Sequence, residues 1–179
     1  RNIGNRVQEE IVLYNIGEAY FRLKQYDTAI RFLIESKNIC RKLSDLVGIT
    51  YANELYGDIL FSQNKIDQAE NIYLENLEFQ KQIDDKEGIA HAFGNLGNVY
   101  KHKKKYDQAE KYYIEQQKML ALVGDKEGEG KAYFNWAILE KARDNKDEAK
   151  IKLQQALKLF ESCSYNDGIQ MTKEQIAKL

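Results

Sequence analysis

The sequence has no proline, only two cysteines and only two histidines among its 179 residues. Proline breaks helices, so its absence, together with a charged fraction of 31%, favours a protein built from long helices. The formal net charge of −1 gives no overall attraction to nucleic acid or to acidic membranes. No apolar run approaches the roughly 20 residues that a membrane-spanning helix needs, and we expect no membrane partner.

The scarce cysteines and histidines exclude several kinds of site. Cys40 and Cys163 lie near opposite ends of the chain, too far apart for a disulfide, and unpaired thiols predict a reducing, cytoplasmic environment. His91 and His102 are 11 residues apart on one predicted helix, about 16 Å along its axis, which is too far for one metal ion. No catalytic or phosphate-binding motif is present. We therefore predict no enzyme activity, no cofactor, no metal and no small-molecule substrate.

What the sequence does contain is a repeat of 40 residues, without insertion, that occurs four times. Small residues and aspartates return at this step in several registers. They are Gly17, Gly57, Gly97 and Ala137; Ala29, Ala69, Ala109 and Ala149; Asp27, Asp67, Asp107 and Asp147; and Gly48, Gly88, Gly128 and Gly168. One period kept in four registers identifies a repeat protein. The chain does not begin with Met, and we expect it to be a piece of a longer protein.

Each repeat has apolar residues at helical spacing in two runs, which predicts two amphipathic helices. The predicted helices are 7–23, 26–43, 46–63, 66–83, 86–103, 106–123, 126–143 and 146–162. A ninth helix is predicted over 168–178, where it would cover the apolar face of the last repeat. We expect a single domain over 1–179, with repeats at about 7–45, 46–85, 86–125 and 126–163 and a capping helix at about 165–179.

The recurring small residues have a packing explanation. A glycine inside a helix costs roughly 1 kcal/mol relative to alanine, so its return at one register needs a cause. We expect Gly97 and Ala109 to lie where the two helices of the third repeat approach most closely. Larger side chains there would force the helices apart.

The spacing of Leu96, Gly97, Tyr100, Ala109 and Tyr113 resembles the tetratricopeptide repeat, and the other repeats keep much of it. The 40-residue length is similar to a subclass found in cell-polarity adaptors and bacterial signalling proteins. The resemblance implies an all-α solenoid of four helix pairs in a right-handed superhelix. It also implies a non-catalytic scaffold that binds an extended or helical protein segment in a concave groove. Departures from the family pattern include Leu60 and Glu140, where tyrosine is usual.

The family's geometry places one side of each first helix in that groove. The predicted contact residues are Asn15, Glu18, Arg22, Glu54, Asp58, His91, Asn95, Asn98, His102, Lys131, Asn135 and Lys141. Asn15, Asn95 and Asn135 share one register, and a carboxamide can pair with the backbone of any extended peptide. The alternative is that these amides are merely solvated. The predicted groove changes from acidic to basic along the chain, so a bound segment would place its basic part toward the first two repeats.

Two further interpretations stay open. The chain could be the sensor or regulatory part of a larger signalling protein, such as a peptide receptor. It could also bind nucleic acid through the cluster Lys101–Lys105, whose simpler explanation is a solvated turn after a helix C-terminus.

Overall fold

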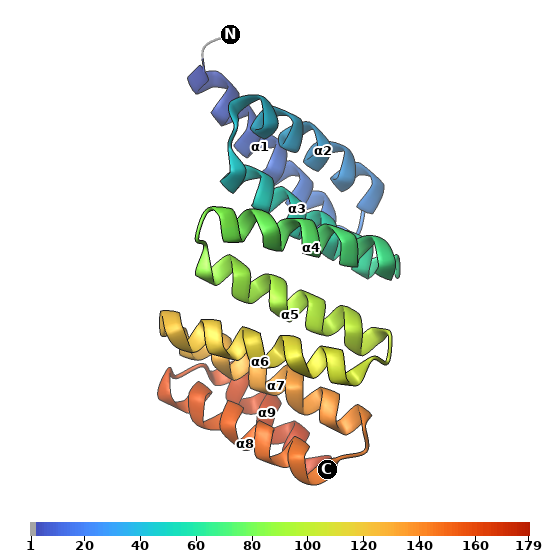
Figure 1. Ribbon diagram of the computed structural model, residues 1–179, viewed down its shortest axis with the longest axis vertical. Helices are drawn as coiled ribbons and strands as arrows, with labels where there is room; N and C mark the ends of the chain where they lie inside the picture. Colours follow the sequence, from blue (N-terminus) through green and yellow to red (C-terminus); the bar gives the residue numbers. More distant parts are fainter. Residues whose placement is uncertain (1–2) are drawn as a thin grey trace. The chain divides into compact units, whose positions relative to one another are not determined.

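The computed structural model describes residues 3–179, and all regular secondary structure in this range is α-helical. The chain forms two compact units, which meet in sequence between Asp85 and Lys86. Unit 1 contains α1 (Ile3–Arg22), α2 (Tyr26–Leu43), α3 (Leu46–Ser62) and α4 (Ile66–Gln82). Unit 2 contains α5 (Lys86–His102), α6 (Tyr106–Val123), α7 (Lys126–Ala142), α8 (Lys146–Ser162) and α9 (Asn166–Ala177) (Figure 1). The predicted helix pairs and the ninth helix are confirmed.

The helix boundaries follow the sequence closely. The seven helices from α2 to α8 begin and end within one residue of the predicted positions. The difference is largest for α1, which begins at Ile3, four residues before the predicted start at residue 7. The last helix also begins two residues early, at Asn166.

Every helix from α1 to α8 is followed by one residue in the left-handed conformation. These residues recur every 20 positions: Lys24, Ser44, Asn64, Asp84, Lys104, Gly124, Asp144 and Ser164. After each, the next residue donates its N–H to a carbonyl five residues earlier, for example Lys105 to Tyr100 at 2.9 Å. This hydrogen bond is the signature of the Schellman helix ending. Gly124, the one glycine among these eight residues, has φ 76°.

The repeated glycines make room for large side chains of the second helix. A Cβ added at Gly57 would lie 2.4 Å from the ring of Tyr73, and one at Gly97 would lie 2.5 Å from the ring of Tyr113. The expectation for Gly97 is therefore refined, since a tyrosine ring, and not the backbone of α6, occupies the space beside it. Ala109 is fully buried, as expected from its register.

Glu140 stands where the family pattern has tyrosine, and it belongs to a buried network of polar side chains. The residue is 1% exposed, and its side chain accepts hydrogen bonds from Trp136 Nε1 at 3.2 Å, Arg143 Nη1 at 3.0 Å and Asn145 Nδ2 at 3.2 Å. Arg143 also forms an ion pair with Glu110 of α6 at 2.8 Å. The carboxylate is thus compensated by partners, as a buried charge requires, and it links α7 to α6.

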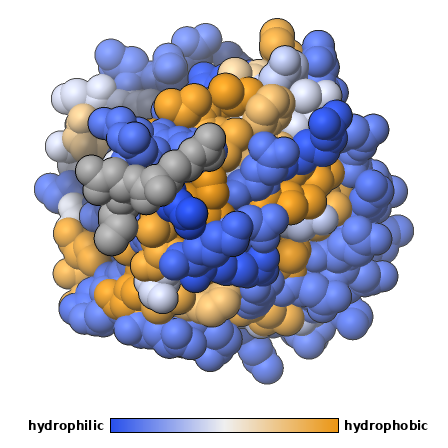
Figure 2. Space-filling view, turned by 90° about the horizontal axis from the view of Figure 1, so that it is seen from above, coloured by the Kyte–Doolittle hydropathy of each residue, from blue (hydrophilic) through white to orange (hydrophobic). Residues whose placement is uncertain are grey.

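The two ends of the repeat array differ. α9 packs against α8 and also contacts α7, so it covers the last helix pair as predicted for a cap. On α1, by contrast, the side chains of Val7, Ile11 and Val12 are 39%, 50% and 54% exposed. Figure 2 views the molecule from the end where α1 lies and shows apolar patches between polar ones.

Candidate functional site

The twelve predicted contact residues all lie on α1, α3, α5 and α7, the first helices of the four pairs. Within unit 1, α1 contacts α3, so the predicted residues of these two helices belong to one face. The predicted residues of unit 2 lie on α5 and α7.

The face of unit 1 is acidic and aromatic. Burial raises the pKa of Tyr14, and the nearby carboxylates of Glu18, Glu54 and Asp58 raise it further. The rings of Tyr14 and Tyr51 lie 6.3 Å apart between centroids. We call these five residues the acidic face. Three of them are predicted contact residues from two different helices, and the structure brings their charges together around one phenol.

Arg22, the predicted basic residue of α1, is paired within its own helix. Its Nη2 lies 2.7 Å from Glu18 Oε1, and its side chain is 76% exposed. An ion pair as exposed as this contributes little to stability, so Glu18 can exchange its partner at little cost.

Asp58 and Asn98 have a packing role that the sequence did not predict. Tyr73 donates its hydroxyl to Asp58 Oδ1 at 2.7 Å, and Tyr113 donates to Asn98 Oδ1 at 2.8 Å. The two pairs occupy the same register in adjacent repeats. Each acceptor satisfies a phenol whose ring is buried, so these two side chains connect the faces to the core.

The face of unit 2 carries the amides. Asn95 on α5 and Asn135 on α7 are both half-buried, while His91 and His102 are exposed. Lys131 is exposed and forms an ion pair with Glu127 at 2.6 Å. Asn95 and Asn135 occupy corresponding turns of two first helices, 40 residues apart. In unit 1 this register holds Asn15, which is exposed, and Leu55, which is buried.

Lys141 is placed differently from the other predicted residues. Its Nζ donates to Gln175 Oε1 of α9 at 2.9 Å. This hydrogen bond could not be predicted from the sequence, because the position of α9 beside α7 follows from tertiary packing. Lys141 therefore helps to hold the capping helix.

Sequence reasoning missed a pocket of about 230 Å³ in unit 2. It lies among α7, the end of α8 and the start of α9, and two predicted residues are part of its wall. The lining residues are Lys131, Phe134, Asn135, Phe160, Tyr165, Gly168 and Met171. One signal could have indicated it: Tyr165 occupies the register that holds Asp45, Asp85 and Asp125 in the earlier repeats.

The basic cluster Lys101–Lys105 lies at the end of α5 and in the turn before α6. Burial lowers the pKa of Lys101, so this lysine is only partly solvated. Lys105 Nζ lies 5.9 Å from the centroid of the Tyr100 ring. The cluster is thus partly integrated into the packing of the α5–α6 pair, and a role in nucleic-acid binding stays a prediction.

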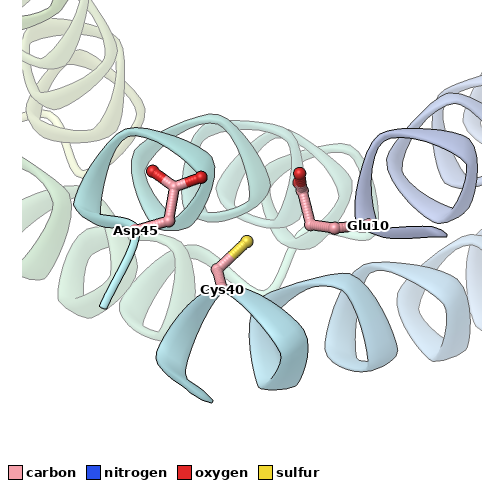
Figure 3. Close-up of side chains that lie close together, drawn as sticks. All are labelled: Glu10, Cys40 and Asp45. Atoms are coloured by element: carbon pink, nitrogen blue, oxygen red, sulfur yellow. The ribbon is translucent and has the colours of Figure 1, made fainter. Parts of the chain in front are cut away.

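A second group of polar side chains lies inside unit 1. Potential ligand atoms of Glu10, Cys40 and Asp45 lie within 4.8 Å of one another (Figure 3). The two carboxylates have roles in the fold, however. Glu10 accepts a hydrogen bond from Ser36 at 3.1 Å, and Asp45 caps α3 by accepting from the Gly48 N–H at 3.0 Å. Burial raises the pKa of the Cys40 thiol to about 12, which opposes the thiolate form that metals bind.

Within residues 3–179, no helix combines the length and apolarity needed to cross a membrane. The search for similar curated proteins gave no match. The tetratricopeptide repeat family matches residues 8–82, 49–116 and 88–162, which together cover most of the chain.

Several solved structures share the fold. The apo form of RapI is 17% identical with a TM-score of 0.84, and the match covers 93% of this chain and 61% of that one. A signal transduction ATPase with a tetratricopeptide repeat sensor from Pyrococcus horikoshii is 20% identical, with a TM-score of 0.82 and coverage of 93% and 26%. The Rap conjugation gene regulator of the plasmid pLS20, in complex with the Phr* peptide, is 16% identical, with a TM-score of 0.81 and coverage of 93% and 46%. The chain thus spans less than two thirds of each of these proteins.

Proposed function

Because the chain belongs to the tetratricopeptide repeat family, we propose that it is a non-catalytic scaffold that binds a segment of another protein through the first helices of its repeats. The pLS20 neighbour, whose structure holds a peptide, supports this role for the fold. The partner would be an extended or helical segment.

The observation that carries the proposal is the pair Asn95 and Asn135. Asparagine is a poor helix former, and both side chains are only half-buried, so packing in the core does not explain their presence. Each carboxamide offers two donors and one acceptor, which is the set needed to pair with a peptide backbone. Two such groups on α5 and α7 would hold a peptide irrespective of its side chains, while neighbouring charges select its sequence.

The acidic face of unit 1 supports a preference for basic segments. Three carboxylates gather beside the rings of Tyr14 and Tyr51, and arginine or lysine can pair with carboxylates and stack on such rings. The face of unit 2 carries Lys131 and two histidines, and we propose that it receives acidic residues. Salt should weaken both contacts.

A second candidate is that the chain is the sensor part of a larger signalling protein. The observation that favours it is the sharing of this fold with Rap proteins and with the repeat sensor of the Pyrococcus ATPase, each of which is longer than this chain. In both candidate functions the chain binds a peptide segment. In the first, binding assembles a complex, and in the second it regulates the rest of a larger protein.

Display selection of random peptides on the whole chain, followed by calorimetry, tests the proposal. The double variant Asn95→Ala, Asn135→Ala should bind the selected peptide at least about tenfold more weakly, because each lost hydrogen bond is worth about 1 kcal/mol. The matched control, Gln154→Ala with Gln155→Ala, removes two exposed amides of α8 and should bind like the parent. Binding by the Asn variant within twofold of the parent would exclude this face.

A further inference from the structure

The pocket among α7, α8 and α9 has the size of one side chain. Its volume of about 230 Å³ is below the range of about 300–1,000 Å³ usual for sites that bind drug-sized molecules. Its walls are largely apolar: Phe134, Phe160, Tyr165 and Met171 all contribute to them. Such a space suits a single apolar group better than a whole small molecule.

The floor of the pocket is held in place by tight packing. Phe160 is 2% exposed, and its ring meets the Tyr165 ring edge-on at 5.3 Å between centroids. A Cβ added at Gly130 would lie 2.4 Å from the Phe160 ring, and one added at Gly168 would lie 2.9 Å from it. The two glycines therefore confine the ring from α7 and α9, which leaves the pocket preformed.

Tyr165 marks the pocket as a departure from the repeat. At the equivalent position, Asp45 and Asp125 cap their helices by accepting the N–H bonds of Gly48 and Gly128. Tyr165 makes no side-chain hydrogen bond to cap α9. The side chain of Tyr165 therefore lines the pocket, whereas the aspartates at the equivalent position cap a helix.

The rim of the pocket carries a positive charge and an exposed apolar side chain. Lys131 Nζ lies 5.2 Å from the centroid of the Tyr165 ring, beside the opening. Its ion pair with Glu127 joins side chains that are 54% and 44% exposed, so it is weak and exchangeable. Met171, which is 51% exposed, gives the rim a flexible apolar side chain that can adapt to an occupant.

We propose that this pocket receives one leucine- or phenylalanine-sized side chain of the bound segment, and that an acidic residue next to that side chain pairs with Lys131. The inference rests on the proposed function, because Asn135, which would hold the backbone of the segment, also lines the pocket. It adds an anchor residue and its charged neighbour to what the partner must contain.

Methyl NMR of the whole chain tests this directly, because the chain has two methionines. Met171 lines the pocket, whereas Met119 packs against a core cluster that includes Leu120 and serves as the internal control. The probe is the peptide acetyl-Ala-Leu-Asp-Ala-amide. Two control peptides replace its Leu by Ser or its Asp by Lys.

The Leu-Asp peptide should shift the Met171 signal, saturating in the millimolar range, and leave Met119 in place. The Ser peptide should bind at least about tenfold more weakly, because burial of a leucine side chain is worth more than one factor of ten. Exchange of Asp for Lys should weaken binding about threefold, and Lys131→Glu should reverse that preference. A Ser peptide that binds as well as the Leu peptide, or equal shifts at both methionines, would overturn the proposal.

Two further outcomes separate this inference from the proposed function. If a display-selected peptide binds by calorimetry while Met171 stays unmoved, the pocket is not the anchor site but the scaffold function stands. If no peptide binds at all, both fail. A Met171 signal that moves with protein concentration alone would identify a second copy of the chain as the occupant and would also overturn the proposal.

Discussion

The substitution Gly97→Ala tests how the repeats pack, because two effects of similar size oppose each other. Alanine should favour the helix by about 1 kcal/mol relative to glycine. Its methyl group would lie 2.5 Å from the ring of Tyr113, and overpacking of this kind costs about 1–3 kcal/mol. The net expectation is a destabilisation of up to about 2 kcal/mol.

Replacing the Tyr113 ring by a smaller side chain should turn the effect of Gly97→Ala from destabilising to stabilising. In the first repeat the corresponding pair is Gly17 and Leu33, and an added Cβ would lie 3.0 Å from the leucine. On a Tyr113→Leu background, Gly97→Ala should therefore recover most of the helix gain of about 1 kcal/mol. The double-mutant cycle should give a coupling energy of about 1–3 kcal/mol.

Urea unfolding of the four proteins, followed by circular dichroism and by tryptophan fluorescence, measures the cycle. Gly17→Ala serves as the control and should also gain most of about 1 kcal/mol of stability, because Leu33 can yield by a few tenths of an ångström. The explanation is refuted if Gly97→Ala stabilises the protein equally in the presence of Tyr113 and of leucine.

Three other predictions follow from single features. Gly124→Ala should cost about 1 kcal/mol, because alanine is strained at φ 76°. No steric clash adds to this cost, since a Cβ there meets no neighbour; an unchanged melting temperature would contradict the prediction. Exposed Cys163 should react with a thiol reagent while buried Cys40 stays protected until the chain unfolds, and equal rates would show that the Cys40 site opens readily. Burial raises the pKa of Tyr73 and Tyr113; the unfolded chain therefore loses protons first, and stability should fall as the pH rises above about 10. A melting temperature that stays constant from about pH 9 to 11 would show that these phenols ionise equally in both states.

The fold was largely predictable because its determinants are local and repeated. The 40-residue step, the apolar spacing and the absence of proline located α2 to α8 to within one residue. The pairing of Gly97 with the Tyr113 ring was only partly predictable, since the sequence shows that a small residue is needed but not which side chain fills the space. The buried network of Glu140 was not predictable, because its partners include Glu110 of another helix through Arg143.

The candidate site was predictable to the level of helices. Every predicted contact residue lies on a first helix, because the family register assigns the face. The roles of individual side chains depended on tertiary contacts: Asn98 is tied to a buried phenol and Lys141 to α9. The pocket was missed because it requires α9 to lie beside α7, although tyrosine in place of aspartate at position 165 was a visible signal.

Binding of a partner segment to the first helices of the repeats can be mapped on the whole chain. A photoreactive side chain is placed in a display-selected peptide, and its crosslinks are located by mass spectrometry. Adducts are expected on α1, α3, α5 or α7, concentrated near Asn95 and Asn135. Adducts confined to the second helices, α2, α4, α6 and α8, would contradict this expectation.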